Sequence, residues 1–115
     1  MLTLEGLKQY GADVETGLAR CINNEAFYLK MVKMALADLS GKNQLEKAMA
    51  EGDVKSAFEA AHSLKGVYGN LSLTPLFVPV SELTEILRAG SMAGVEPLLE
   101  AYLDAFQKLQ ELAAE

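Results

Sequence analysis

The stretch of sequence that decides the fold reads DVKSAFEAAHSLKGVYGNL, over residues 53–71. Its apolar residues recur every three or four positions, which is the period of a helix that buries one face. The apolar positions are Val54, Ala57, Ala61, Leu64, Tyr68 and Leu71. Asp53 stands directly before them, where a helix N-cap is favoured. The pattern therefore predicts an amphipathic helix that starts after Asp53 and reaches about Leu71.

The same helical period continues upstream of this stretch. A short opening turn is expected around residues 3–9, followed by a short helix that Asp13 caps. The two asparagines at 23–24 mark the start of a longer helix. The Ser-Gly pair at 40–41 interrupts or kinks that helix, and Gly52 closes it.

Two more helices are expected downstream. Thr74 and Pro75 are typical of an N-cap followed by proline at the first helical position, and this helix should end at Gly90. Pro79 lies inside it and is expected to kink its first turns. The last helix should begin within residues 91–97, and its buried stripe runs through Leu98, Leu99, Tyr102, Phe106, Leu109 and Leu112.

Together these segments predict an all-α protein. Four longer helical stretches joined by short links favour an antiparallel four-helix bundle, with short additional N-terminal helices. Half of the 115 residues are apolar, which is enough for one core. We therefore expect a single domain over residues 1–115, with the core bundle at about 24–113.

Composition excludes several classes of function. The formal net charge is −6 and the cations are scattered, so the basic footprint of a nucleic-acid-binding protein is missing. One cysteine and one histidine leave neither an internal disulfide nor a Cys/His metal site. The chain has no long apolar run and no signal-peptide pattern at its start, so we expect a cytoplasmic protein that does not enter a membrane. Its partners should be proteins or small molecules.

The single histidine, His62, falls about 130° away from the centre of the apolar stripe on an ideal helix, so its ring should face solvent. Gly66 and Gly69 lie one and two turns further on, on the same flank. Each costs about 1 kcal/mol relative to alanine in a helix interior. Because no predicted helix end explains them, we interpret them as access for another protein. Lys65, three residues after His62, is placed to reach an anion held on the imidazole.

These residues together favour a phosphoryl group as that anion. A neutral imidazole nitrogen is a competent nucleophile near neutral pH, and phosphoryl transfer needs mainly positioning and positive charge. A lone histidine on an amphipathic helix is usually no more than a surface residue. The joint pattern of solvent direction, a cation and two glycines is what favours function here.

The segment from Ala60 to Leu71 resembles the signature of histidine-containing phosphotransfer (HPt) domains, His-x-Leu-Lys-Gly, at residues 62–66. The likeness extends to Asp13-Val14 with Gly17-Leu18-Ala19-Arg20, to Phe27-Tyr28-Leu29 and to Gly52-Asp53, which are similar to HPt domains attached to hybrid sensor kinases. Two positions depart from the family pattern. Ser72 stands where glycine is frequent, and Pro79 is unusual within the following helix.

The resemblance implies a phosphate carrier of two-component phosphorelays. His62 would accept a phosphoryl group from a receiver-domain aspartate and pass it to another response regulator. Lys65 would give electrostatic support and Gly66 would give the partner clearance. The partners implied are receiver domains and a hybrid sensor histidine kinase. The carrier would have no kinase or ATPase activity of its own, and no cofactor or metal, because Mg²⁺ is expected in the receiver's acidic pocket.

Partner contacts are also expected at Phe58 and Gly69, although core packing explains Phe58 equally well.

Two other functions compete with the carrier. A helical-bundle adaptor would dock a receiver or kinase domain without carrying phosphate. An autonomous enzyme such as a histidine phosphatase is disfavoured, because the sequence shows no second catalytic acid, arginine clamp or Gly-rich phosphate loop. Nothing in the composition calls for more than a monomer.

Overall fold

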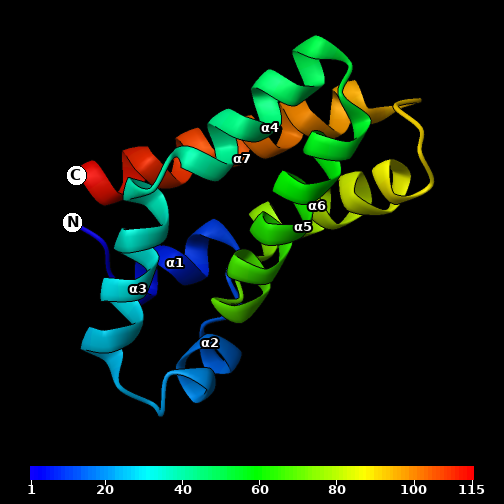
Figure 1. Cartoon of the computed structure of the whole chain (residues 1–115). Helices are drawn as coiled ribbons and strands as arrows, with labels where there is room; N and C mark the ends of the chain where they lie inside the picture. The colour runs from blue at the N-terminus through cyan, green and yellow to red at the C-terminus, as the bar shows by residue number, and fades with distance from the viewer.

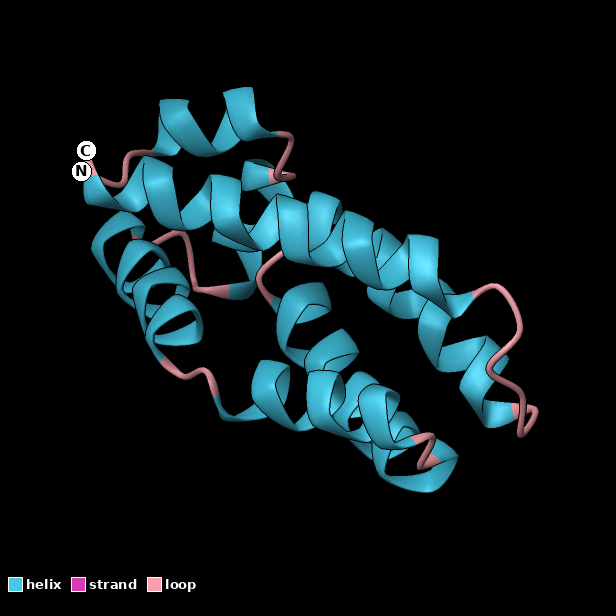
Figure 2. Ribbon diagram, turned by 90° about the horizontal axis from the view of Figure 1, so that it is seen from above, coloured by secondary structure: helices cyan, strands magenta, loops and turns pink.

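The computed structural model describes residues 1–115 and contains only helices and their connections, without strands (Figures 1 and 2). The helices are α1 (Leu4–Tyr10), α2 (Val14–Arg20), α3 (Glu25–Ala37), α4 (Ser40–Glu51), α5 (Val54–Asn70), α6 (Thr74–Arg88) and α7 (Val95–Ala114). The predicted all-α class is therefore confirmed. No helix is both long enough and apolar enough to cross a bilayer.

Helices α4 to α7 form the bundle, and the predicted antiparallel arrangement with short N-terminal helices is confirmed. Each of these helices packs against the next one along the chain. The bundle closes where α4 meets α7, since the Lys42 ammonium lies 5.7 Å from the ring centroid of Phe106. Helix α3 leaves the bundle at an angle and contacts α7, and the two chain ends lie close together (Figures 1 and 2).

Three of the seven helices start at capping residues that the sequence predicts. The side chains of Asp13, Asn24 and Asp53 each accept a hydrogen bond from the backbone N–H of the third residue of α2, α3 and α5. Gly52 ends α4 in the left-handed conformation, at φ +70°. Helix α7 begins within the predicted window. These ends follow from local side-chain chemistry, which is why sequence alone locates them.

The break in the long second stretch lies earlier than predicted. Helix α3 ends at Ala37, and the Asp38 carboxylate accepts bonds from the Ser40 N–H at 3.1 Å and the Ser40 hydroxyl at 2.7 Å. Ser40 and Gly41 instead open α4. A Cβ at Gly41 would lie 2.8 Å from Leu64 Cδ2, so this glycine permits close packing of α4 on α5 and is not a helix breaker.

The prediction that Thr74 caps α6 is wrong by one residue. Leu73 is the N-cap and makes no side-chain capping bond, while Thr74 and Pro75 occupy the first helical positions. Helix α6 runs without a break past Pro79 and ends at Arg88, two residues before Gly90. Buried packing of Pro79 holds it within the helix despite its missing N–H.

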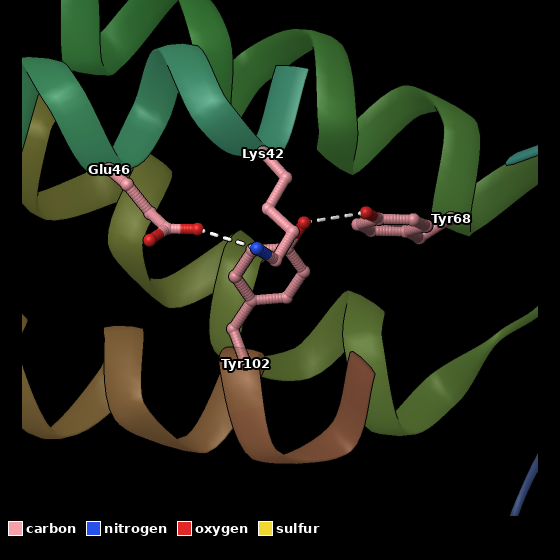
Figure 3. Close-up of polar contacts among 4 residues, drawn as sticks. All are labelled: Lys42, Glu46, Tyr68 and Tyr102. Carbon is pink, nitrogen blue, oxygen red and sulfur yellow. Dashed lines mark hydrogen bonds and ion pairs between the residues drawn. The ribbon is translucent and has the colours of Figure 1, made fainter. Parts of the chain in front are cut away.

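The core centres on aromatic side chains from several helices. Tyr28, Tyr68, Tyr102 and Phe106 are all at most 2% exposed. The hydroxyls of Tyr68 in α5 and Tyr102 in α7 are 2.7 Å apart and share a hydrogen bond, beside the Lys42–Glu46 ion pair of α4 (Figure 3). Burying such rings stabilises the fold by roughly 1.5–3 kcal/mol each, and the hydroxyl pairing avoids the cost of a buried unpaired group.

The N-terminal segment, residues 1–28, holds the C-terminal end of α5. Three backbone carbonyls there accept hydrogen bonds from this segment: Gly69 O from Arg20 Nη1 at 2.8 Å, Leu71 O from the Tyr28 hydroxyl at 2.7 Å, and Ser72 O from the Asp13 N–H at 2.9 Å. Ser72 itself has φ +54°, a left-handed conformation that is costly for a residue with a side chain. The segment therefore fixes the turn between α5 and α6.

Candidate functional site

His62 lies in the middle of α5 and its side chain is exposed, as its position on the helix predicts. One turn earlier, the Phe58 ring stacks on the imidazole, with centroids 5.6 Å apart and ring planes 16° apart. Phe58 is half-buried and packs against the core. The stack therefore links the histidine ring to a fixed group and limits the directions it can take.

Lys65 is the cation that the sequence predicts to support His62, and it forms an ion pair with a carboxylate from α6. Its ammonium lies 3.7 Å from Glu85 Oε2. The other oxygen of Glu85 is 3.4 Å from Nε of Arg88, whose guanidinium lies 5.1 Å from the Phe58 ring centroid. Glu85 and Arg88, near the end of α6, therefore bring paired charges to one side of the Phe58–His62 stack.

The two glycines beside His62 have different surroundings. A Cβ at Gly66 would meet nothing within 4 Å, so the helix surface next to the histidine is open. A Cβ at Gly69 would lie 3.1 Å from Phe77 Cε1. The interpretation of Gly69 as a mid-helix glycine is wrong, because α5 ends at Asn70. Packing against Phe77 gives Gly69 a structural reason to be glycine, whereas Gly66 has none.

A shallow hollow brings the site residues together. It is lined by Arg20, His62, Lys65, Gly66, Gly69, Asn70 and Phe77. Two of these residues are cations and none is an acid, so the hollow favours an anion despite the chain's net charge of −6. Phe58 touches His62 from outside this hollow.

Sequence reasoning missed the residues that other helices supply to this surface. Arg20 comes from α2 and donates to Gly69 O across 49 positions of sequence, while Phe77, Glu85 and Arg88 come from α6. Helical periodicity relates residues within one helix and says nothing about such contacts. Arg20 was singled out only as part of the family resemblance, which gave it no role.

The chemistry available is that of an exposed imidazole beside cations and an open backbone. Such a ring acts as a nucleophile, and nearby positive charge stabilises a phosphoryl group during its transfer. Comparisons with curated proteins and with solved structures gave no match. A comparison with family models matched the Hpt domain over residues 30–114, which includes His62 and the helices of the bundle. The chain therefore belongs to the Hpt domain family, the histidine phosphotransfer domains of two-component signalling systems.

Proposed function

We propose that His62 accepts a phosphoryl group from the aspartyl phosphate of one receiver domain and passes it to an aspartate of another. The unprotonated ring nitrogen attacks phosphorus, and the bond from phosphorus to the aspartyl oxygen breaks with its electron pair leaving on the carboxylate. The other ring nitrogen keeps its proton or releases it to solvent. The reverse displacement, by the next receiver's carboxylate, restores the free imidazole.

The observation that carries this proposal is the open helix surface beside an exposed His62. A receiver aspartate sits in a pocket, so the imidazole must enter that pocket together with the backbone that bears it. Gly66 leaves this approach clear, since no side chain occupies the space one turn from the ring. Near-contact of the reacting atoms, at about 3–3.5 Å, is what such clearance makes possible.

The remaining predicted residues take supporting roles in this proposal. Lys65 would neutralise charge on the moving phosphoryl group, and Phe58 would orient the imidazole and contact the partner. Gly69 would contribute contact only through its backbone, since its packing on Phe77 already accounts for it. Mg²⁺ would be supplied by the receiver's own pocket.

We also propose that the chain acts as one domain over residues 1–115, as a monomeric cytoplasmic carrier without kinase activity of its own. The hydrogen bonds from Asp13, Arg20 and Tyr28 to the end of α5 support inclusion of the N-terminal segment in that domain. Sedimentation of the purified chain tests the monomer.

Replacement of His62 distinguishes a carrier from an adaptor that only docks a receiver. His62→Gln removes the nucleophile and keeps a polar side chain of similar reach. We expect this variant to bind a receiver domain normally, by calorimetry, and to take no label from the phosphorylated receiver. Ser63→Ala is the matched control, because its side chain points about 100° away, and it should accept label like the wild type. Binding without label in the wild type would identify an adaptor.

A further inference from the structure

Glu85 holds an unusual place among the ion pairs of this protein. Two of the four ion pairs converge on its carboxylate, one with Lys65 of α5 and one with Arg88 of its own helix. The Lys65–Glu85 pair joins two helices, whereas the others lie within one helix. Both cations that Glu85 binds stand beside the Phe58–His62 stack.

The Lys65–Glu85 contact is loose enough to exchange. Its atoms are 3.7 Å apart, and the two side chains are 31% and 57% exposed. Exposed ion pairs of this kind contribute little to stability, because water screens the charges and two long side chains must be ordered. A phosphoryl group carries about −1.5 to −2 charges near neutral pH, more than a carboxylate does. When such a group is held on His62, it therefore competes with Glu85 for the same ammonium.

We propose that Glu85 is a resident anion that sets the balance of phosphoryl transfer. It is a positioning residue: in the free chain it holds Lys65 and Arg88 in place, and it lowers the affinity of the site for the phosphoryl group. The phosphorylated chain must give up or weaken the Lys65–Glu85 pair. Glu85 thereby biases His62 toward donating to a receiver. This inference rests on the proposed carrier function and adds a residue to it.

The expected size of the effect of Glu85 on the transfer equilibrium follows from the interaction of exposed charges a few ångströms apart in a medium close to water. Coulomb interactions there amount to about 1 kcal/mol at 4 Å and less beyond, which corresponds to a change of roughly threefold to fivefold in an equilibrium ratio. Salt reduces such an effect, since the screening length is about 8 Å at physiological ionic strength.

The test is the transfer equilibrium between the intact chain and a phosphorylated receiver domain, measured as the ratio of phospho-His62 to phospho-aspartate. Glu85→Gln should raise this ratio about threefold to fivefold at low salt, and the difference should shrink at high salt. Glu100→Gln is the control for net charge, because α7 supplies no residue to the hollow, and its ratio should match the wild type. Thermal unfolding checks that both variants remain folded.

A second pair of variants distinguishes competition for Lys65 from a general effect of charge. In a Lys65→Met background, Glu85→Gln should change the ratio much less, since the ammonium for which the two anions compete is gone. An unchanged ratio in Glu85→Gln, or an equal shift with and without Lys65, would overturn the role of Glu85 while leaving the carrier intact. If the wild type itself takes no label, the proposed function fails, and this inference fails with it.

Discussion

Gly66 and Gly69 both lie on α5 near His62, and only Gly69 packs closely against a side chain of another helix. Open space at Gly66 means that the fold gains nothing from this glycine, which lies inside a helix where glycine is unfavourable. Gly69 leaves room for Phe77 and lies in the last turn of α5. Partner access is the role we propose for the first, and packing explains the second.

Alanine at these two positions should separate stability from function. Gly66→Ala should raise the free energy of unfolding by about 0.5–1 kcal/mol and slow transfer from a receiver by about tenfold, because the added methyl displaces the reacting groups. Gly69→Ala should lower stability, because its Cβ would lie 3.1 Å from Phe77. Urea unfolding and timed transfer assays measure both. A Gly66→Ala variant that transfers as fast as the wild type would remove the clearance role.

At the residue scale, the sequence predicts the histidine, the neighbouring cation and the open glycine, because all of them lie on one helix with a fixed period. Phe58 was assigned to either packing or binding, and the structure shows it packed on the core and stacked on His62. Arg20, Phe77, Glu85 and Arg88 could not be predicted, since their places depend on how separate helices dock.

At the scale of elements, the turn between α5 and α6 contains an unfavourable backbone conformation. Ser72 adopts φ +54°, where glycine is free and other residues are strained. A glycine at this position would adopt the same backbone conformation without that strain.

Ser72→Gly should therefore stabilise the protein by about 0.5–1 kcal/mol. The variant relieves the backbone strain, and the greater conformational entropy of glycine in the unfolded chain offsets part of that gain. The matched control is Ser81→Gly inside α6, which should destabilise by about 1 kcal/mol. Denaturant midpoints of the two variants should move in opposite directions. A loss of stability in Ser72→Gly would show that the serine side chain contributes more than its backbone costs.

The contact between the N-terminal segment, residues 1–28, and the end of α5 can be tested through Tyr28. Tyr28→Phe removes the hydroxyl that donates to Leu71 O and leaves that buried carbonyl unpaired, at a cost of about 1–2 kcal/mol. Hydrogen exchange of the Leu71 and Leu73 amides should quicken, because both bond back to the end of α5. Tyr10→Phe, which instead removes a hydroxyl bond to Ala105 O on α7, should leave those amides protected. Equal exchange rates of these amides in both variants would show that the Tyr28 hydroxyl does not hold the end of α5.

Helix ends were predicted best where one capping side chain decides them, as at Asp13, Asn24, Asp53 and Gly52. The predictions erred where tertiary packing decides instead. The sequence predicts a break at Gly41, which instead makes room for Leu64, and a cap at Thr74, on a helix that has no side-chain cap. Composition and local pattern do not contain that information.

At the scale of the whole molecule, the buried tyrosines make the fold sensitive to alkali. Burial raises the pKa of Tyr28 and of Tyr68 to about 12, and it raises the pKa of Tyr10 and Tyr102 as well. In the unfolded chain these hydroxyls ionise near pH 10. Between these values the unfolded state holds fewer protons, so stability falls as pH rises.

We expect the free energy of unfolding to stay level between pH 7 and 9 and to decline from about pH 10 to about pH 12. Urea titrations across that range measure it. Tyr28→Phe should reduce the slope of the free energy of unfolding against pH, between about pH 10 and about pH 12. The reduction should correspond to about one proton, or about 1.4 kcal/mol per pH unit. A constant stability up to pH 12 would show that these rings ionise as readily in the fold as outside it.

The bundle as a whole follows from helical period and short links, and the sequence predicts it. The position of the N-terminal segment against the end of α5 does not follow, because it depends on three hydrogen bonds between residues far apart in the chain. That segment also lies outside the matched family region, residues 30–114. Its contribution to the site is therefore a feature that only the structure reveals.

Phosphoryl flow from one receiver to another shows directly whether His62 is a phosphoryl carrier. The intact chain is mixed with a labelled phospho-receiver, purified away from it, and then given an unlabelled second receiver. We expect acid-labile, base-stable label on His62, found by mass spectrometry, which then moves to an aspartate of the second receiver. Label on any other residue, or no label on a chain that still binds the receiver, would show that His62 is not a phosphoryl carrier.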